Sequence, residues 1–231
     1  MTRCISVVIP ALNEVKKLPD NVAQLARCEA VQEIIVVDGG STDGTFEAML
    51  KLAEQASPVR LALFRSEPGR AQQMNFGAGQ ASGEWLLFHH ADSFLSCAAI
   101  QAIAELGDEQ MWGGFEHSFS PNNWKLKLVS WLHNFRWRQT GVVYGDQSMF
   151  VRRSLFNALG GFKEHTIEDL EFSDRALEQA ASVLLPFRVQ TDSRKFLQMG
   201  EFRALWKVCV ILWRYERNRQ VGEREFFQPY R

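Results

Sequence analysis

The sequence predicts an α/β fold in which helices flank a mostly parallel central sheet. Over the first hundred residues, short apolar runs alternate with helical stretches, and each run ends in a polar, Gly-rich or Pro-containing turn. Continuous apolar runs are typical of strands that are buried on both faces of a parallel sheet. With 231 residues and 46% hydrophobic content, the chain is long enough to bury the core of one such domain.

The predicted elements follow from these runs in chain order. Strands are expected at residues 5–9, 33–37, 60–65 and 85–89, and apolar residues at helical spacing from Phe46 to Ala53 predict a helix. Beyond Met111 the sequence becomes rich in Trp and Phe. It then predicts a strand near 142–151, a helix near 169–179, a strand near 183–187 and a helical segment from 201 onward. Functional residues are expected at the carboxyl ends of the strands, where such sheets bind their ligands.

Composition and cysteine usage narrow the class of protein. The 26 basic and 27 acidic residues nearly cancel, which argues against nucleic acid as a partner. Cys4, Cys28, Cys97 and Cys209 lie far apart and are predicted to be reduced core residues. The first strand follows the N-terminus without a secretory signal, which favours a cytoplasmic location. The apolar stretch near the C-terminus is broken by Lys207 and is too short for a membrane span.

Two motifs follow the first two predicted strands. Residues 8–14 are VIPALNE, and residues 36–44 are VVDGGSTDG. An Asp at a strand end can accept hydrogen bonds from a base or a ribose, and glycines let the backbone approach a ligand closely. In sequence and order, these motifs resemble the openings of the family 2 glycosyltransferases, which have the GT-A, nucleotide-diphospho-sugar transferase-like fold. The resemblance implies that Pro10, Ala11, Glu14, Asp38 and Gly40 bind the nucleotide sugar.

A third segment, GRAQQMNFGA, contains Arg70 and resembles the family motif G-R-x-x-Q-x-N-x-G. The resemblance implies that Arg70 faces the nucleotide, where a guanidinium offers forked donors to a pyrimidine carbonyl or a phosphate. Structural alternatives stay open for these motifs. Arg70 can be an ordinary surface arginine, Asp38 and Asp43 can cap turns, and Gly77 and Gly79 can simply permit tight helix packing.

The fourth predicted strand runs into the segment HHADS, where the family usually carries its D-x-D metal motif. His90 replaces the first Asp, and Asp92 is the second. The H-A-D form resembles a subgroup of small single-domain bacterial members. The resemblance implies that a divalent ion, Mn²⁺ or Mg²⁺, bridges the donor phosphates through Asp92. His90 either adds a nitrogen ligand, which suits Mn²⁺ better than Mg²⁺, or orients its neighbours without touching the ion.

The second half carries a GGF segment at 160–162, followed by the pair Glu168 and Asp169 before a predicted helix. In the family a "G-G-F" and an "E-D" pair lie on the acceptor side, so the resemblance implies that Asp169 is the general base. A base is needed because a sugar hydroxyl is a poor nucleophile until its proton is removed. From the residues alone, Thr166 to Asp169 also resembles a helix capping box, and both roles can hold together.

Two further segments carry basic residues. Arg194 and Lys195 stand where related enzymes carry a basic-aromatic segment. The resemblance therefore implies that Arg194 binds the nucleotide sugar near its diphosphate, and the alternative is that this segment is a solvated basic loop. The segment from Trp124 to Arg138 combines tryptophans with Lys and Arg. It can line an acceptor groove, rest peripherally on a membrane surface, or form a packed core helix with snorkelling basic edges.

The resemblance covers residues 5–200 and implies one glycosyltransferase domain over residues 1–231. Its parts are a nucleotide-sugar-binding half (1–110), an acceptor and catalytic half (111–200) and a C-terminal helical segment (201–231). The implied reaction is transfer of a sugar, with inversion, from a nucleotide diphosphate sugar to an acceptor. The family resemblance favours a UDP-sugar as the donor. The acceptor, a saccharide, a lipid-linked molecule or a small molecule, is not identified. Because His90 departs from the motif, a nucleotide-sugar-binding module with weak or no catalysis is the alternative. A nicotinamide-dependent oxidoreductase is disfavoured, because no G-x-G-x-x-G turn follows the first strand.

Overall fold

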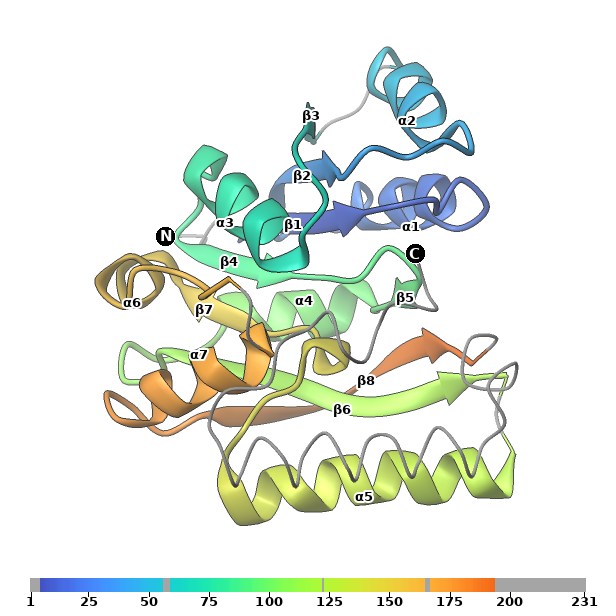
Figure 1. Cartoon of the computed structure of the whole chain (residues 1–231). Coiled ribbons are helices and arrows are strands. Elements are labelled where there is room, and N and C mark those ends of the chain that lie inside the picture. Colours follow the sequence, from blue (N-terminus) through green and yellow to red (C-terminus); the bar gives the residue numbers. More distant parts are fainter. Residues whose placement is uncertain (1–4, 56–58, 122, 165–166, 194–231) are drawn as a thin grey trace.

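The structure is a computed structural model that describes residues 5–55, 59–121, 123–164 and 167–193. Helices and strands alternate through most of this chain (Figure 1). The strands are β1 (Ile5–Ala11), β2 (Val31–Asp38), β3 (Arg60–Arg65), β4 (Trp85–Phe88), β5 (Ser93–Phe94), β6 (Trp112–Ser120), β7 (Phe150–Arg152) and β8 (Val183–Asp192). The helices are α1 (Leu18–Leu25), α2 (Thr45–Ala53), α3 (Arg70–Gln80), α4 (Cys97–Ala104), α5 (Trp124–Thr140), α6 (Arg153–Ala158) and α7 (Glu168–Leu177), with a short 3-10 helix η1 (Gly145–Gln147).

The strands of the described residues join one sheet in the order β3-β2-β1-β4-β7-β6-β8-β5. β3, β2, β1 and β4 run parallel to one another, and β6 runs parallel to β8. β7 is antiparallel to both of its neighbours, and β5 is antiparallel to β8. The predicted α/β fold with a mostly parallel central sheet is therefore confirmed, and both halves of the chain contribute to the same sheet.

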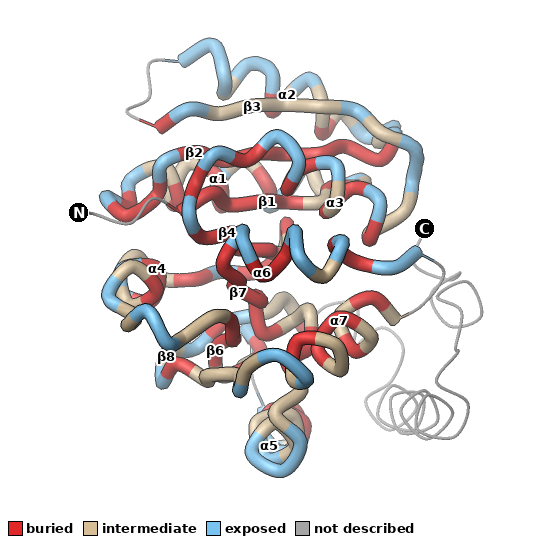
Figure 2. The backbone as a smooth tube through the Cα atoms, turned by 90° about the vertical axis from the view of Figure 1, so that its left-hand side faces the viewer, coloured by how far each residue is buried: buried red, intermediate tan, exposed pale blue. Residues whose placement is uncertain are grey.

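Helices cover both faces of this sheet. Ile5, Val7 and Ile9 of β1 point into a core that also includes side chains of α1, α2 and α4. Val8 points to the opposite face, into a core with α3, α6 and α7. Successive side chains of a strand point to opposite faces, so a strand between two helical layers is apolar throughout. Figure 2 shows these central strands buried and the outer sides of the helices exposed.

The carboxyl ends of β1, β2 and β4 lie at one edge of the sheet. Ala11 is the register partner of Asp38, and Val8 is the partner of Phe88. The turns that follow Ala11, Asp38 and Phe88 therefore open at this edge, as the sequence predicts for the first, second and fourth strands. All three turns carry motifs on which the resemblance depends.

The predicted strand over 142–151 is wrong for most of its length, because a 3-10 turn, η1, interrupts it. The side-chain oxygen of Gln147 accepts the Tyr144 N–H at 3.0 Å, and Ser148 has a φ of 48°. Both features are incompatible with a continuous extended chain, so only β7 remains as a strand. The sequence also does not predict β6, whose glycine pair Gly113 and Gly114 lowers its strand propensity.

Helix α5 packs on the end of β6 through Leu126 and Val129, which contact Phe119. The opposite face of the helix is open to solvent, with Trp124 and Trp131 exposed by 70% and 55%. The interpretation of this segment as a packed core helix therefore holds for one face of the helix only. Within the described residues, no helix is both long enough and apolar enough to cross a membrane.

Two of the four cysteines are joined in a disulfide bond, Cys28 to Cys97. The prediction of reduced cysteines is wrong for this pair, because the fold brings together residues separated by 69 positions in sequence. Cys4 and Cys209 lie outside the described residues. Disulfides persist mainly in oxidising compartments, so the cysteines do not support the predicted cytoplasmic location, which stays a prediction.

Candidate active site

The turns after β1 and β2 are tied to each other by hydrogen bonds. The Asn13 N–H donates to Ser41 Oγ at 2.9 Å, and Asn13 Oδ1 accepts the Thr42 N–H at 2.9 Å. The Glu14 N–H donates to Thr45 Oγ1, also at 2.9 Å. Asn13 has a φ of 55°, a left-handed conformation that asparagine adopts more readily than most residues. The first two sequence motifs therefore form one loop region at the carboxyl edge.

Asp38 is 1% exposed at the end of β2 and holds the turn that follows it. Its Oδ2 accepts the N–H groups of Gly40 and Ser41 at 3.1 and 3.0 Å, and the Ser41 hydroxyl donates to Oδ1. Gly40 has a φ of 90°, which glycine adopts without steric strain. On the neighbouring strand β1, Ala11 pairs with Asp38, and Pro10 pairs with Val37. Because a carboxylate oxygen can accept more than one hydrogen bond, the nucleotide-binding role of Asp38 stays a prediction beside this turn-capping role.

Asp43 has the capping role that the sequence leaves open. Its Oδ1 accepts the Thr45 N–H at 3.0 Å and the Thr45 hydroxyl at 2.5 Å, and its Oδ2 accepts the Val15 N–H at 3.2 Å. Desolvation raises the pKa of Asp43, but these donors outweigh it and hold the pKa below its ordinary value. Asp43 therefore stabilises the loop region as an anion.

The GRAQQMNFGA segment forms α3 and supports the site through residues to which the sequence gives no role. Gln73 Nε2 donates to the carbonyls at the ends of β1 and β2, at 3.0 and 2.7 Å. Asn75 exchanges two hydrogen bonds with the backbone of Phe162, at 2.8 and 2.9 Å. A Cβ at Gly77 would lie 2.5 Å from Val8 Cγ1, so tight helix packing is the role of this glycine. Gln73, Asn75 and Gly77 thus join α3 to the strands and to the GGF loop.

The guanidinium of Arg70, at the start of α3, contacts residues from two other elements. Its Nη2 lies 2.9 Å from His90 Nε2, and its Nε lies 2.8 Å from an oxygen of Glu168, which is 3% exposed. Since arginine can only donate, His90 Nε2 accepts. Desolvation and the Arg70 charge lower the pKa of His90 to about 3, so this histidine is neutral at neutral pH.

Gly145 lies where Arg70, His90 and Asp169 converge. Its N–H donates to Asp169 Oδ2 at 2.6 Å. A Cβ on Gly145 would overlap Arg70 Nη2 and would lie 3.2 Å from His90 Nε2 and 3.3 Å from Asp169 Oδ2. The fold therefore brings three predicted site residues, from α3, the end of β4 and α7, around a single glycine.

Asp169 is the second residue of α7. The N-cap residue is Ile167, and no side chain supplies a capping hydrogen bond there. Thr166, on which the capping-box alternative depends, lies outside the described residues. The Asp169 carboxylate instead accepts the Leu170 N–H at 2.9 Å and the Gly145 N–H. These two bonds hold it toward Arg70 and His90.

The loop after β4 carries Asp92 and two histidines with different surroundings. His89 is fully buried; its Nε2 donates to the Ser93 carbonyl at 2.9 Å, and its Nδ1 accepts from Ser148 Oγ at 2.8 Å. Burial lowers the pKa of His89 to about 4. The nearby Asp92 charge raises the pKa of both His89 and His90, but by less than burial lowers it. A partly exposed carboxylate beside neutral histidines fits a divalent ion, which prefers hard oxygen ligands.

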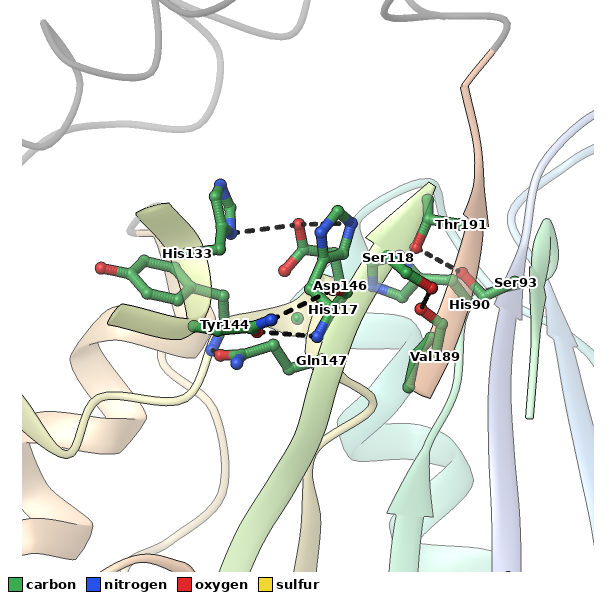
Figure 3. A network of polar contacts seen from close by, with 12 residues as sticks. His90, Ser93, His117, Ser118, His133, Tyr144, Asp146, Gln147, Val189 and Thr191 are labelled. Atoms are coloured by element: carbon green, nitrogen blue, oxygen red, sulfur yellow. Dashed lines mark hydrogen bonds and ion pairs between the residues drawn. The ribbon is translucent and has the colours of Figure 1, made fainter. Parts of the chain in front are cut away.

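A further polar cluster, shown in Figure 3, lies next to this site and is not predicted by the sequence. Asp146 Oδ2 lies 3.6 Å from His117 Nε2 and 3.5 Å from His133 Nδ1. Burial lowers the pKa of His117 to about 4. Burial raises the pKa of Asp146, but His133, His117, His90 and Arg70 outweigh it and lower that pKa. The two histidines belong to different elements, β6 and α5, so no short sequence motif joins them.

Two predictions fall on parts of the chain outside the described residues. One is the nucleotide-sugar role of Arg194, together with the basic segment that contains it. The other is the C-terminal helical segment at 201–231.

A mostly parallel sheet, with glycine turns and carboxylates at one edge, defines a nucleotide-diphospho-sugar transferase-like fold of the GT-A type. The family described as "Glycosyl transferase family 2" matches residues 6–160. The chain belongs to this family, and it is a glycosyltransferase.

Relatives and solved structures agree with this assignment. A PGL/p-HBAD biosynthesis glycosyltransferase of Mycobacterium bovis is 30% identical over 193 residues, which cover 77% of this chain and 71% of the relative. The mannosyltransferase PcManGT from Pyrobaculum calidifontis, in complex with GDP-Man and Mn²⁺, has a TM-score of 0.65 at 20% identity. S. aureus TarS 1–349 in complex with UDP has a TM-score of 0.64 at 20% identity. The alignments cover 80% and 81% of this chain but only 56% and 60% of those two chains.

Proposed function

We propose that this glycosyltransferase transfers a sugar from a nucleoside diphosphate sugar, a UDP-sugar, to an acceptor hydroxyl with inversion. The observation that carries the proposal is the convergence of Arg70, His90 and Asp169 around Gly145, beside the loop of Asp92. Residues assigned by the resemblance to the donor side and to the acceptor side thus lie within contact of one glycine. Two similar folds, PcManGT and TarS, have been solved with GDP-Man and with UDP or UDP-GlcNAc, which supports a nucleotide sugar as the donor.

On the donor side, the nucleotide lies against the two joined turns at the carboxyl edge. Asp38 accepts hydrogen bonds from the base or the ribose, while the backbone of Pro10, Ala11 and Gly40 allows close approach. Glu14 continues the same loop. Arg194 is assigned to this side by the resemblance alone.

Arg70 acts on the diphosphate in this proposal, and not on the pyrimidine. Its guanidinium is directed to His90 at the end of β4, next to the loop of Asp92. A planar guanidinium offers several donors in a fixed geometry, which suits phosphate oxygens. Glu168 holds the guanidinium from the other side, at 2.8 Å.

A divalent ion, Mn²⁺ or Mg²⁺, held by Asp92 would neutralise the negative charge that develops on the departing diphosphate. His90 Nε2 accepts from Arg70, which supports the orienting role for this histidine over the role of a ligand. Neutral His90 holds the Arg70 guanidinium without competing with the phosphates for its charge.

Asp169 removes the proton of the acceptor hydroxyl as that oxygen attacks the anomeric carbon. Its Oδ2 already accepts the Gly145 N–H at 2.6 Å, which fixes the carboxylate in orientation. Attack from the side opposite to the leaving diphosphate, in a single displacement, inverts the anomeric centre. A nucleotide-sugar-binding module without catalysis remains the alternative, and the substitution of Asp169 described in the Discussion decides between them.

A thermal-shift panel tests the donor. The full chain is melted with UDP-sugars, GDP-sugars or no nucleotide, each with and without Mn²⁺, and with Mn²⁺ alone as a reference. A ligand that binds only the native state at a hundred times its Kd adds about 2.7 kcal/mol to the free energy of unfolding. We expect the largest rise in Tm with a UDP-sugar and Mn²⁺ together. Absence of a shift with every nucleotide sugar would refute the proposed function.

Exposed apolar side chains on α5 support a peripheral membrane contact, which would suit a lipid-linked acceptor. Trp124, Leu128, Trp131 and Phe135 recur at i, i+4, i+7 and i+11 and are 43–70% exposed. Lys125 and other basic residues flank this stripe, as in helices that lie on anionic bilayers. We expect co-sedimentation with phosphatidylglycerol vesicles that weakens in the Trp131→Gln variant. Equal sedimentation of the variant and the parent would exclude the contact.

A further inference from the structure

We propose that His117, His133 and Asp146 form a second cation site, separate from the Asp92 loop, for a divalent transition ion of the zinc class. Each residue offers one ligand atom, and the three atoms lie within 4.8 Å of one another. They come from three different elements, β6, α5 and η1. Figure 3 shows the three side chains turned toward a common point.

The distances fit coordination better than hydrogen bonding. Asp146 Oδ2 lies 3.6 Å from His117 Nε2 and 3.5 Å from His133 Nδ1, beyond the range of a good N–H···O bond. Ligands at the usual zinc bond lengths in a tetrahedron lie about 3.3 Å from each other. A small inward movement of these side chains would therefore bring all three atoms to bonding distance of one ion.

The polar atoms of the cluster are buried without hydrogen-bond partners among the described residues. This holds for both ring nitrogens of His117, for His133 Nδ1 and for Asp146 Oδ1. His117 is only 2% exposed, so water is a poor substitute for a partner. Buried polar groups are normally paired, because leaving them unpaired costs free energy. A bound cation would engage the nitrogens and the carboxylate together.

The scaffold holds the ligands in position before any ion binds. Asn134, next to His133 on α5, accepts the His117 N–H through Oδ1 at 2.8 Å and donates to the His117 carbonyl through Nδ2 at 3.2 Å. The side-chain oxygen of Gln147 accepts the Tyr144 N–H, which closes the turn that carries Asp146. Both ends of the cluster are thus fixed by backbone contacts.

The ligand chemistry selects the class of ion. Two imidazole nitrogens and one carboxylate oxygen suit Zn²⁺ and related transition ions, whereas Mg²⁺ and Ca²⁺ prefer oxygen ligands alone. Three protein ligands leave a further coordination position for water. Asp146 directly follows Gly145, whose N–H holds Asp169, so an ion here would fix the turn at the centre of the active site.

Metal binding to the nucleotide-free full chain tests this site apart from the donor. Without a diphosphate, the Asp92 loop lacks most of the oxygen ligands it would use. We expect equilibrium dialysis to show one Zn²⁺ or Co²⁺ per chain, with visible Co²⁺ absorption typical of low coordination number, and no displacement by excess Mg²⁺.

The matched variants are His133→Gln, at a side chain that is 18% exposed, and Asp92→Asn. We expect His133→Gln to bind at least tenfold more weakly and Asp92→Asn to bind as the parent does. If His133→Gln loses its native circular dichroism, Asp146→Asn replaces it in the same assay. The proposal is overturned if the parent binds no ion, if the cluster variants bind as tightly as the parent, or if Asp92→Asn loses the ion equally. The thermal panel measures nucleotide-sugar binding, whereas the dialysis measures metal binding to the nucleotide-free chain. A negative result for this cation site therefore does not contradict the proposed donor.

Discussion

Replacing Asp169 by asparagine removes the proposed base while keeping the size of the side chain. In the parent, Oδ2 accepts the Gly145 N–H at 2.6 Å and Oδ1 accepts the Leu170 N–H at 2.9 Å. An asparagine has one amide oxygen and one NH₂ group, so it can accept only one of these two bonds. The other backbone N–H then faces a donor.

The structure allows the cost in stability to be separated from the cost in rate. Loss of one hydrogen bond to a charged acceptor costs about 1.5–3 kcal/mol of unfolding free energy. The free energy of unfolding of a domain is usually about 5–15 kcal/mol in total, so we expect the variant to stay folded. Loss of general-base assistance lowers turnover about a hundredfold to ten-thousandfold. This equals about 2.7–5.4 kcal/mol of activation free energy.

The assay follows release of nucleoside diphosphate from the donor that the thermal panel identifies. Glu178→Gln is the matched control, because it removes one negative charge at an exposed position at the C-terminal end of the same helix, opposite to the end that carries Asp169. We expect Asp169→Asn to bind the donor as the parent does and to turn over at least a hundredfold more slowly, with the control unchanged. A folded Asp169→Asn enzyme that turns over at the parent's rate would remove Asp169 from the mechanism.

Three further substitutions test the fold and the donor site. Gly77→Ala should lower the free energy of unfolding by about 1–3 kcal/mol, because its Cβ would lie 2.5 Å from Val8 Cγ1; Gly79→Ala, in open space, should be neutral or slightly stabilising in the same urea titration. Burial raises the pKa of Glu33, but hydrogen-bond donors outweigh it and hold the pKa below its ordinary 4.5. Its contribution is therefore present above pH 4.5 and lost as the pH falls through the lower folded value, so Glu33→Gln should flatten the acid limb of the stability curve; an unchanged limb would contradict this. Asp38→Ala should weaken UDP binding by about 1–3 kcal/mol in calorimetry, and equal affinity would dismiss its nucleotide role.

The site itself was only partly predictable from sequence. The motif positions of Arg70, His90 and Asp169 are visible in the chain, but their convergence on Gly145 is not, because the four residues lie on separate elements. The direction of the Arg70 guanidinium, toward His90 and Glu168, also depends on how α7 packs. A motif fixes the type of a side chain, whereas its partner is set by packing.

Local pattern alone determined the parallel half of the sheet and the place of the motif turns. A strand between two helical layers must be apolar on both sides, so the strands predicted at 5–9, 33–37 and 85–89, which overlap β1, β2 and β4, are visible without any long-range information. Tertiary structure alone decided the Cys28–Cys97 bond, which joins residues 69 positions apart, and the cluster of His117 and His133 on neighbouring elements. The reason is physical: burial periodicity is a property of consecutive residues, whereas a bond or an ion site requires atoms that only the packed chain brings within a few ångströms.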